Sequence, residues 1–177
     1  MNILGKKTFL RPFEVRDITE EYISWLNNPE VTRFSNQRFK IHNRESSELY
    51  LNSFKGTDNL FFLILDLESK KAIGTLTCYI SLNHQSVDIG ILIGEIDTWG
   101  KGFGQDAWDA IMNWLLNKKG FRKITAGTLS VNKGMVKLME RSGMEFEARR
   151  KKQEILEGEF IDLVYYAKFN DEVKDPK

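Results

Sequence analysis

Residues 89–107 read IGILIGEIDTWGKGFGQDA, and this stretch determines the fold that we expect for the chain. Its first five residues belong to Val87–Ile93, a run rich in β-branched residues. This composition favours a central, buried strand. Its last part contains three alternate glycines and leads into an apolar pattern of helical period. The sequence therefore predicts a strand, a glycine loop and a helix in direct succession.

The glycines of this loop indicate an anion-binding site. Glycine lets the backbone approach a ligand closely, and the free amides and the dipole of a helix start attract negative charge. Lys101 adds a formal positive charge to the loop. A tight turn required only for packing is the other interpretation of the same glycines.

The loop fits neither of two common nucleotide-binding motifs. A P-loop ends in Gly-Lys-Ser/Thr, and this loop does not. A dinucleotide-binding loop lies near the chain start in a parallel βαβ unit, with an acid at the end of the next strand. Here the loop follows an antiparallel meander past the middle of the chain.

Patterns in the rest of the chain predict an α/β fold. We expect seven strands, at Thr8–Pro12, Leu60–Leu65, Ala72–Ile80, Val87–Ile93, Lys123–Leu129, Met144–Ile155 and Phe160–Phe169. We expect helices from Asp17 to the stop at Asn27-Asn28-Pro29, and over Asn43–Ser53, Gly102–Lys118 and Asn132–Arg141. A meander that leads into a strand–helix–strand crossover predicts a mixed sheet with helices on both faces.

Composition limits the kind of protein that this chain can be. Its 177 residues suit one domain, and 41% hydrophobic residues exclude a disordered chain. The 26 basic residues balance 25 acidic ones, so no general affinity for nucleic acid is expected. No apolar run approaches a membrane span or a signal peptide, and the single cysteine, Cys78, favours a reducing compartment. We expect a cytoplasmic protein without a nucleic-acid or membrane partner.

Three segments together resemble the GNAT N-acetyltransferases. WGKGFGQDAW at 99–108 is similar to their acetyl-CoA signature, Gln/Arg-x-x-Gly-x-Gly/Ala, with Trp99 in place of the usual Gln or Arg. FLRPFEVRDITEEYISWLNNPEV at 9–31 and NKGMVKLMERSGMEFEA at 132–148 resemble the branch of the ribosomal-protein-alanine N-acetyltransferases. That branch also includes acetyltransferases of sugar-nucleotide amines and of antibiotics. The resemblance runs from about Thr8 to Phe169 and identifies the family, not the substrate.

The resemblance implies one acyl-CoA N-acyltransferase domain over residues 1–177, with a splayed, mostly antiparallel seven-stranded sheet. Acetyl-CoA would be the co-substrate and no metal would be needed. The pantetheine arm would pair with the backbone of Ile91, Leu92 and Ile93, and Asn132 would face it. The loop would hold the pyrophosphate through Trp99, Gly100, Lys101, Gly102, Phe103, Gly104 and Gln105.

Acetyl transfer to an amine requires a base, an oxyanion donor and a leaving thiolate. Asp88 is the first candidate base because it interrupts an apolar strand on the face of Gly90 and Leu92. Glu95 is the second candidate, and His84 is interpreted as a solvated turn residue. The resemblance implies the Leu92 amide as the oxyanion donor.

The general acid cannot be assigned from the sequence. Met139 stands where many members carry a tyrosine, and Met135 stands where protein acetylators often carry a serine. Both methionines are interpreted as packing residues, and Met135 argues against acetylation of ribosomal proteins.

The acceptor site is expected in the first two helices, the loop Pro29–Ile41 and the terminal strand pair. Candidate contacts there are Trp25, Arg33, Phe34, Arg38 and Phe39. Interleaved arginine and phenylalanine suit an anionic, ring-bearing acceptor such as a nucleotide-linked amino sugar. A peptide N-terminus, a catalytically silent acetyl-CoA-binding module, and a homodimer all stay open as alternatives.

Overall fold

The computed structural model describes residues 1–173 and contains eight strands and five α-helices. The strands are β1 Ile3–Leu4, β2 Thr8–Pro12, β3 Leu60–Asp66, β4 Ala72–Ser81, β5 Ser86–Ile93, β6 Lys123–Leu129, β7 Glu145–Leu156 and β8 Glu159–Phe169. The helices are α1 Glu20–Asn27, α2 Pro29–Thr32, α3 Arg44–Asn52, α4 Phe103–Asn113 and α5 Lys133–Arg141. Residues 174–177 of the expected single domain lie outside the described residues.

The expected mixed sheet is confirmed, with one strand more than the seven expected. The additional strand, β1, has two residues, which is too short to leave a pattern in the sequence. The helix expected from Asp17 begins instead at Glu20, because the Thr19 hydroxyl accepts a hydrogen bond from the Tyr22 amide. The Asp17 carboxylate pairs with Arg11 at 2.6 Å. No helix within residues 1–173 is long and apolar enough to cross a bilayer.

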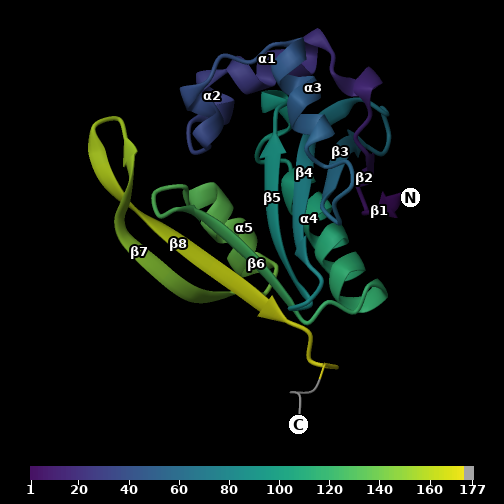
Figure 1. Ribbon diagram of the computed structural model, residues 1–177, viewed down its shortest axis with the longest axis vertical. Helices are drawn as coiled ribbons and strands as arrows, with labels where there is room; N and C mark the ends of the chain where they lie inside the picture. The colour runs from purple at the N-terminus through teal and green to yellow at the C-terminus, as the bar shows by residue number, and fades with distance from the viewer. Residues whose placement is uncertain (174–177) are drawn as a thin grey trace.

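The strands form one sheet in the order β1-β2-β3-β4-β5-β6-β8-β7, and only β5 and β6 are parallel neighbours. Alternate residues of β3 face opposite layers, as expected of a strand that is covered on both sides. Phe61 and Leu63 pack against residues of α1 and α3, whereas Phe62 and Ile64 pack with α4 and α5. Figure 1 shows α1, α2 and α3 gathered at the end of the molecule toward which β5 points.

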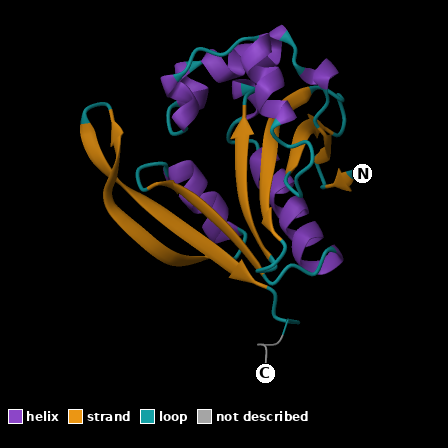
Figure 2. Cartoon of the chain, viewed as in Figure 1, coloured by secondary structure: helices purple, strands orange, loops and turns teal. Residues whose placement is uncertain are grey.

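The two halves of the sheet separate after a short contact. β5 pairs with β6 only through Ser86–Asp88, whereas its pairing with β4 continues to Ile93. In Figure 2 the hairpin of β7 and β8 diverges from the central strands. The splay implied by the family resemblance is therefore present.

Asp106 joins the start of α4 to the first hairpin of the chain. Its carboxylate accepts hydrogen bonds of 2.8–2.9 Å from the amides of Lys6, Lys7 and Thr8 and from the Thr8 hydroxyl. Burial alone would raise the pKa of Asp106, but these hydrogen bonds outweigh it and hold the pKa below its usual value. The glycine loop is thereby anchored from a segment about 100 residues away.

Asp106→Asn should lower the free energy of unfolding by about 1–2 kcal/mol at neutral pH, because the ionised acceptor is lost from a partly exposed site. The difference from the unaltered protein should shrink as pH falls below about 4, since a lowered native pKa contributes stability only above the unfolded value. Urea unfolding at several pH values measures it. Asp58→Asn, at an exposed position, is the control. An equal effect of both substitutions at neutral pH would contradict the role of Asp106.

Candidate active site

One edge of β5 is free to pair with a ligand. After the pair Asp88 and Thr125, no described strand neighbours residues 89–93 on the side of β6. The other edge stays paired with β4. An unpaired strand edge presents a row of backbone donors and acceptors, which an extended molecule can satisfy as an added strand would.

The end of β5 is fixed by two backbone hydrogen bonds to one carbonyl and by the indole of Trp25. The amides of Gly94 and Glu95 both donate to the Ile73 carbonyl, at 2.9 and 3.1 Å. A Cβ at Gly94 would lie 2.1 Å from a carbon of the Trp25 ring, so only glycine fits there. Trp25, expected as an acceptor contact, is 5% exposed and packs in the core beneath α1.

The loop after β5 is held to the strand by Trp99. The indole Nε1 of Trp99 donates to the Ile93 carbonyl at 3.0 Å. The Glu95 carboxylate accepts a long hydrogen bond of 3.4 Å from the Asp97 amide and so caps the turn Ile96–Thr98. Both side chains therefore shape the loop in this structure.

The start of α4 presents amides without a side-chain cap. Gly102 is the residue before the helix and has φ +85°, a conformation that favours glycine. The amides of Phe103, Gly104 and Gln105 belong to the first helical turn, where no intrahelical acceptor exists. Lys7 adds a cation that the sequence did not reveal: its Nζ donates to the Lys101 carbonyl at 2.9 Å. Two lysines and a helix start thus surround one potential anion site.

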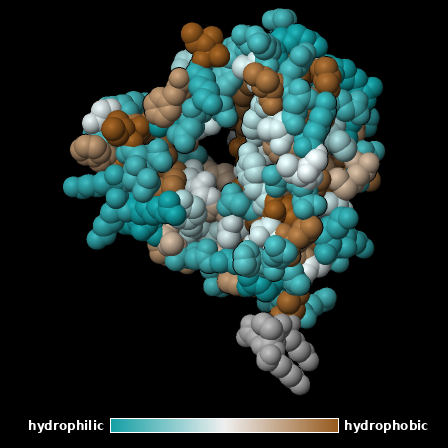
Figure 3. All heavy atoms as spheres, in the orientation of Figure 1, coloured by the Kyte–Doolittle hydropathy of each residue, from teal (hydrophilic) through white to brown (hydrophobic). Residues whose placement is uncertain are grey.

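A cavity of about 420 Å³ opens beside the free edge of β5. Gly90, Ile91 and Leu92 form its floor with Thr75 and Thr77 of β4. Its other walls come from α1, α3 and residues 35–42. Figure 3 shows a hollow at the centre of this face, between the helical end and the hairpin side of the molecule.

The cavity wall mixes hydroxyl groups with apolar and aromatic side chains and contains no carboxylate among the described residues. The Tyr50 and Tyr79 hydroxyls lie 3.1 Å apart, and burial raises the pKa of Tyr50. Lys40 is the lysine in the wall, and His42 is the histidine. The wall therefore suits a neutral or anionic molecule better than a polycation.

The model of the acetyltransferase (GNAT) domain matches residues 7–145, which is more than half of the chain. The chain belongs to the GNAT acetyltransferase family. A curated relative, the N-acetyltransferase 9-like protein of Caenorhabditis briggsae, is 26% identical over 124 residues, covering 64% of this chain and 62% of its own. The chain spans 28% and 62% of the lengths of the two curated relatives that it matches.

Solved structures share this GNAT fold. RimL, the ribosomal L7/L12 α-N-protein acetyltransferase in complex with coenzyme A, has a TM-score of 0.84 at 16% identity, covering 97% of this chain and 99% of that one. Spermidine N-acetyltransferase from Vibrio cholerae, in complex with CoA and spermine, has a TM-score of 0.82 at 20% identity, covering 94% and 97%. At such identities the likeness concerns the fold.

The two arginines expected to bind the acceptor reach the tip of the β7–β8 hairpin and do not line the cavity beside β5. Arg33 forms a two-pronged ion pair with Glu157, at 2.9 and 3.0 Å, and Arg38 donates to the Ile155 carbonyl at 3.0 Å. Each guanidinium also lies over the ring of the following residue, Phe34 or Phe39. None of these four residues lines the cavity.

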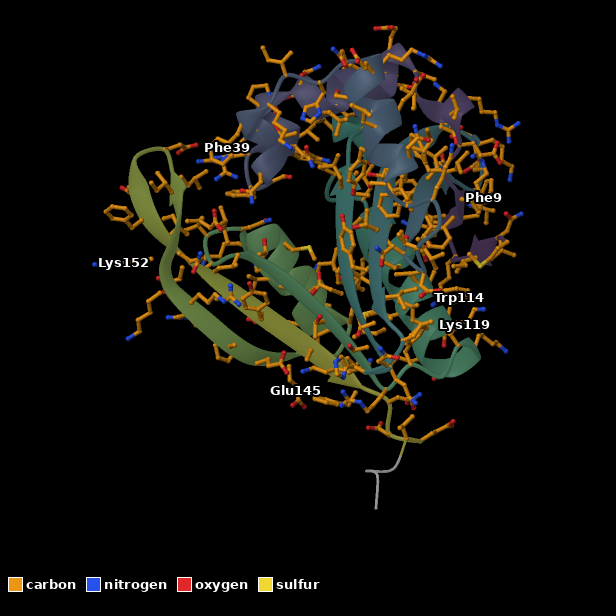
Figure 4. The ribbon with its side chains drawn as sticks, in the orientation of Figure 1. Phe9, Phe39, Trp114, Lys119, Glu145 and Lys152 are labelled. Carbon is orange, nitrogen blue, oxygen red and sulfur yellow. The ribbon has the colours of Figure 1, made fainter. Side chains whose placement is uncertain are left out.

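Figure 4 places Phe39 on the side of its segment that faces this hairpin, and Lys152 on the outer side of the hairpin. The bridge of Arg33 and Arg38 therefore joins the acceptor loop to the far half of the splayed sheet. The pairing could not be read locally, because 124 residues separate Arg33 from Glu157.

Asp88 lies at the closed end of the split between β5 and β6. The Thr125 hydroxyl donates to its carboxylate at 2.7 Å. Burial raises the pKa of Asp88, and this hydrogen bond opposes the rise. Asp88 lies outside the cavity wall and four residues before Leu92, about 13 Å along an extended strand. It can reach an amine beside Leu92 only through water.

The α5 residues singled out in the sequence lie in structural positions. The Asn132 side chain caps α5 by accepting from the Met135 amide at 3.2 Å, and its Nδ2 donates to Thr128. Met139 is fully buried in the core, and Met135 packs against that core. Both the oxygen and the nitrogen of the Asn132 side-chain amide are thus engaged within the protein.

Lys101→Glu should weaken coenzyme A binding about tenfold, which corresponds to about 1.4 kcal/mol, because it replaces a cation by an anion at the start of α4. Calorimetry at low ionic strength measures the affinity. Lys55→Glu changes the net charge equally at an exposed position after α3, and it should bind as the unaltered protein does. If both variants keep the original affinity, the anion site lies elsewhere.

Proposed function

We propose that this protein transfers an acetyl group from acetyl-CoA to a primary amine by direct attack within a ternary complex. One observation carries the proposal: the free edge of β5 joins the uncapped start of α4 to a cavity of about 420 Å³. The three features suit, in order, an extended arm, a pyrophosphate and a small second substrate.

In this proposal the pantetheine arm pairs with the backbone of Ile91–Ile93, and the amides from Gly100 to Gln105 hold the pyrophosphate. The thioester then lies beside Leu92. The Leu92 amide, which the family resemblance implied as the oxyanion donor, faces Thr75 of β4 in the antiparallel ladder. The amides of Ile91 and Ile93 point to the free edge and are the proposed donors to the developing oxyanion. Holding the amine and the thioester side by side supplies much of the rate enhancement. No step of this reaction calls for a metal.

The acceptor is proposed to be a small amine on a neutral or anionic scaffold, such as a nucleotide-linked amino sugar. Hydroxyls, aromatic rings and Lys40 line the cavity, and a polyamine would find no carboxylate in its wall. Because Arg33 and Arg38 are engaged with the hairpin, we assign recognition of an anionic group to Lys40 in their place. A peptide N-terminus is the alternative acceptor.

Asp88 and Glu95 are the bases suggested by the sequence, and neither lines the cavity. Asp88 keeps a proposed role as the end of a water chain, since its raised pKa makes it a better proton acceptor than an ordinary aspartate. The Glu95 carboxylate instead accepts a hydrogen bond from the Asp97 amide in the turn that it caps.

The acceptor class can be tested by thiol release from acetyl-CoA with a nucleotide-linked amino sugar, a short peptide and spermidine side by side. We expect the highest kcat/KM for the amino sugar and the lowest for spermidine. Lys40→Met should raise the Michaelis constant of the anionic acceptor about tenfold, the effect of one partly exposed charge-assisted bond, and leave that of acetyl-CoA unchanged.

Lys55→Met removes the same charge away from the cavity and is the control. A preference for spermidine, or for the peptide with Lys40 dispensable, would overturn the proposed acceptor class. Absence of thiol release with every amine would instead support a silent acetyl-CoA-binding module.

A further inference from the structure

His42 is held in the cavity wall by hydrogen bonds to its backbone and to its ring. Its backbone amide donates to Asn27 Oδ1 and its carbonyl accepts from Asn27 Nδ2, both at 2.8 Å. The residue is 9% exposed, although neither neighbour, Ile41 nor Asn43, is buried. The side-chain amide of Asn27, at the end of α1, thus fixes the position of the His42 backbone.

The ring itself has one defined orientation. Nε2 of His42 lies 3.2 Å from the Gln37 carbonyl oxygen. A carbonyl oxygen can only accept, so Nε2 carries the hydrogen in the neutral imidazole. The lone pair of the ring is therefore on Nδ1, and Nδ1 has no hydrogen-bond partner among the described residues.

The ring shares a cavity with the strand edge at which the thioester is proposed to lie. His42 enters the wall from the segment that follows Gln37–Lys40, and Leu92 enters it from β5. Figure 1 shows the helical layer that carries this segment above the end of β5. An amine in the cavity would thus lie between the imidazole and the carbonyl carbon that it must attack.

The titratable groups that share the cavity wall with the ring include no carboxylate among the described residues. The titratable side chains in the same wall are Lys40, Tyr22 from α1, Tyr50 from α3 and Tyr79 from β4. Burial raises the pKa of Tyr22 and of Tyr50, which keeps both phenols neutral. The wall thus contains one lysine and no carboxylate in the part of the chain that the structure describes. A neutral imidazole is the form that accepts a proton.

We propose that His42 is the catalytic base that takes the proton from the ammonium group of the acceptor. This inference rests on the acetyl transfer proposed above. Nδ1 accepts one proton from RNH3⁺, and the freed nitrogen lone pair forms the C–N bond to the thioester carbonyl. The C–S electron pair leaves on sulfur, the second nitrogen proton passes to the thiolate to give the thiol, and His42 releases its proton to solvent.

The chain offers a matched pair of variants, since it contains only two histidines, His42 and His84. His42→Gln keeps a donor for the Gln37 carbonyl but offers no basic nitrogen, and His84 lies exposed in the turn between β4 and β5. We expect His42→Gln to lower kcat about 10²–10⁴-fold, the range of a positioned base, with little change in coenzyme A affinity. His84→Gln should behave as the unaltered protein, and Asp88→Asn should lose less than His42→Gln.

The pH profile separates catalysis from a structural role. In the unaltered protein the acid limb of kcat/KM should coincide with the titration of His42 followed by NMR, and His42→Gln should lose that limb. A folded His42→Gln variant with full activity and an unchanged profile would overturn the proposal. Thermal melting shows whether the variant is folded.

The tautomer gives a second measurement that needs no acceptor. Nitrogen-15 NMR of the two imidazoles, recorded at a pH where His42 is neutral, should show its proton on Nε2 and none on Nδ1. A neutral His42 ring with its proton on Nδ1 would overturn the proposal even if His42→Gln failed to fold. Lack of thiol release by the unaltered protein would contradict the proposed function, whereas the tautomer would still test His42.

Discussion

The parting of β5 from β6 after Asp88 is the constraint on which the rest of the site depends. Three parallel pairs hold the two halves of the sheet together, and beyond them β5 keeps a neighbour on one side only. Backbone groups left unpaired in this way need a partner or water. The free edge lies between the core beneath α4 and α5 and the cavity under α1 and α3. A single break in a hydrogen-bond ladder therefore provides a place for an extended cofactor arm and brings it beside a space for a second molecule.

Contacts from distant segments keep the open edge in place. Trp25 packs on Gly94 and prevents any side chain there, while Trp99 holds the following loop to the last carbonyl of β5. Asp106 fixes the start of α4 against the first hairpin. On the far side, Arg33 and Arg38 join the acceptor loop to the tip of the β7–β8 hairpin. An exposed ion pair contributes little to stability, about 0–1 kcal/mol, so this bridge can open without endangering the fold. The contacts of Trp25, Trp99 and Asp106 thus hold the cofactor side of the site, whereas the weaker bridge of Arg33 and Arg38 lies on the side of the hairpin.

Local patterns in the sequence were enough for most of the fold and for the cofactor loop. Period-two and β-branched runs located seven strands, and the alternate glycines located the start of α4. Each of these signals is made by residues that are close together in the sequence. Contacts between distant segments left no such signal: Asp106 with Lys6 to Thr8, Arg33 with Glu157, and the cavity wall at His42. His84 drew attention as a histidine in a turn, whereas the buried His42 followed an exposed loop and could be recognised only through its partners Asn27 and Gln37. Interleaved arginine and phenylalanine suggested an acceptor site, but in the structure these residues stack on one another and face the hairpin.

Backbone hydrogen exchange with and without coenzyme A tests the central claim most directly, because the proposed contacts are made by main-chain amides that no side-chain substitution removes. Addition of coenzyme A should slow exchange in two separate segments, residues 91–93 at the free edge of β5 and residues 102–105 at the start of α4. Exchange in the β7–β8 hairpin strands should change little by comparison. Protection at the start of α4 without any at residues 91–93 would mean that the arm does not use the open edge, and protection at neither segment would contradict the account as a whole.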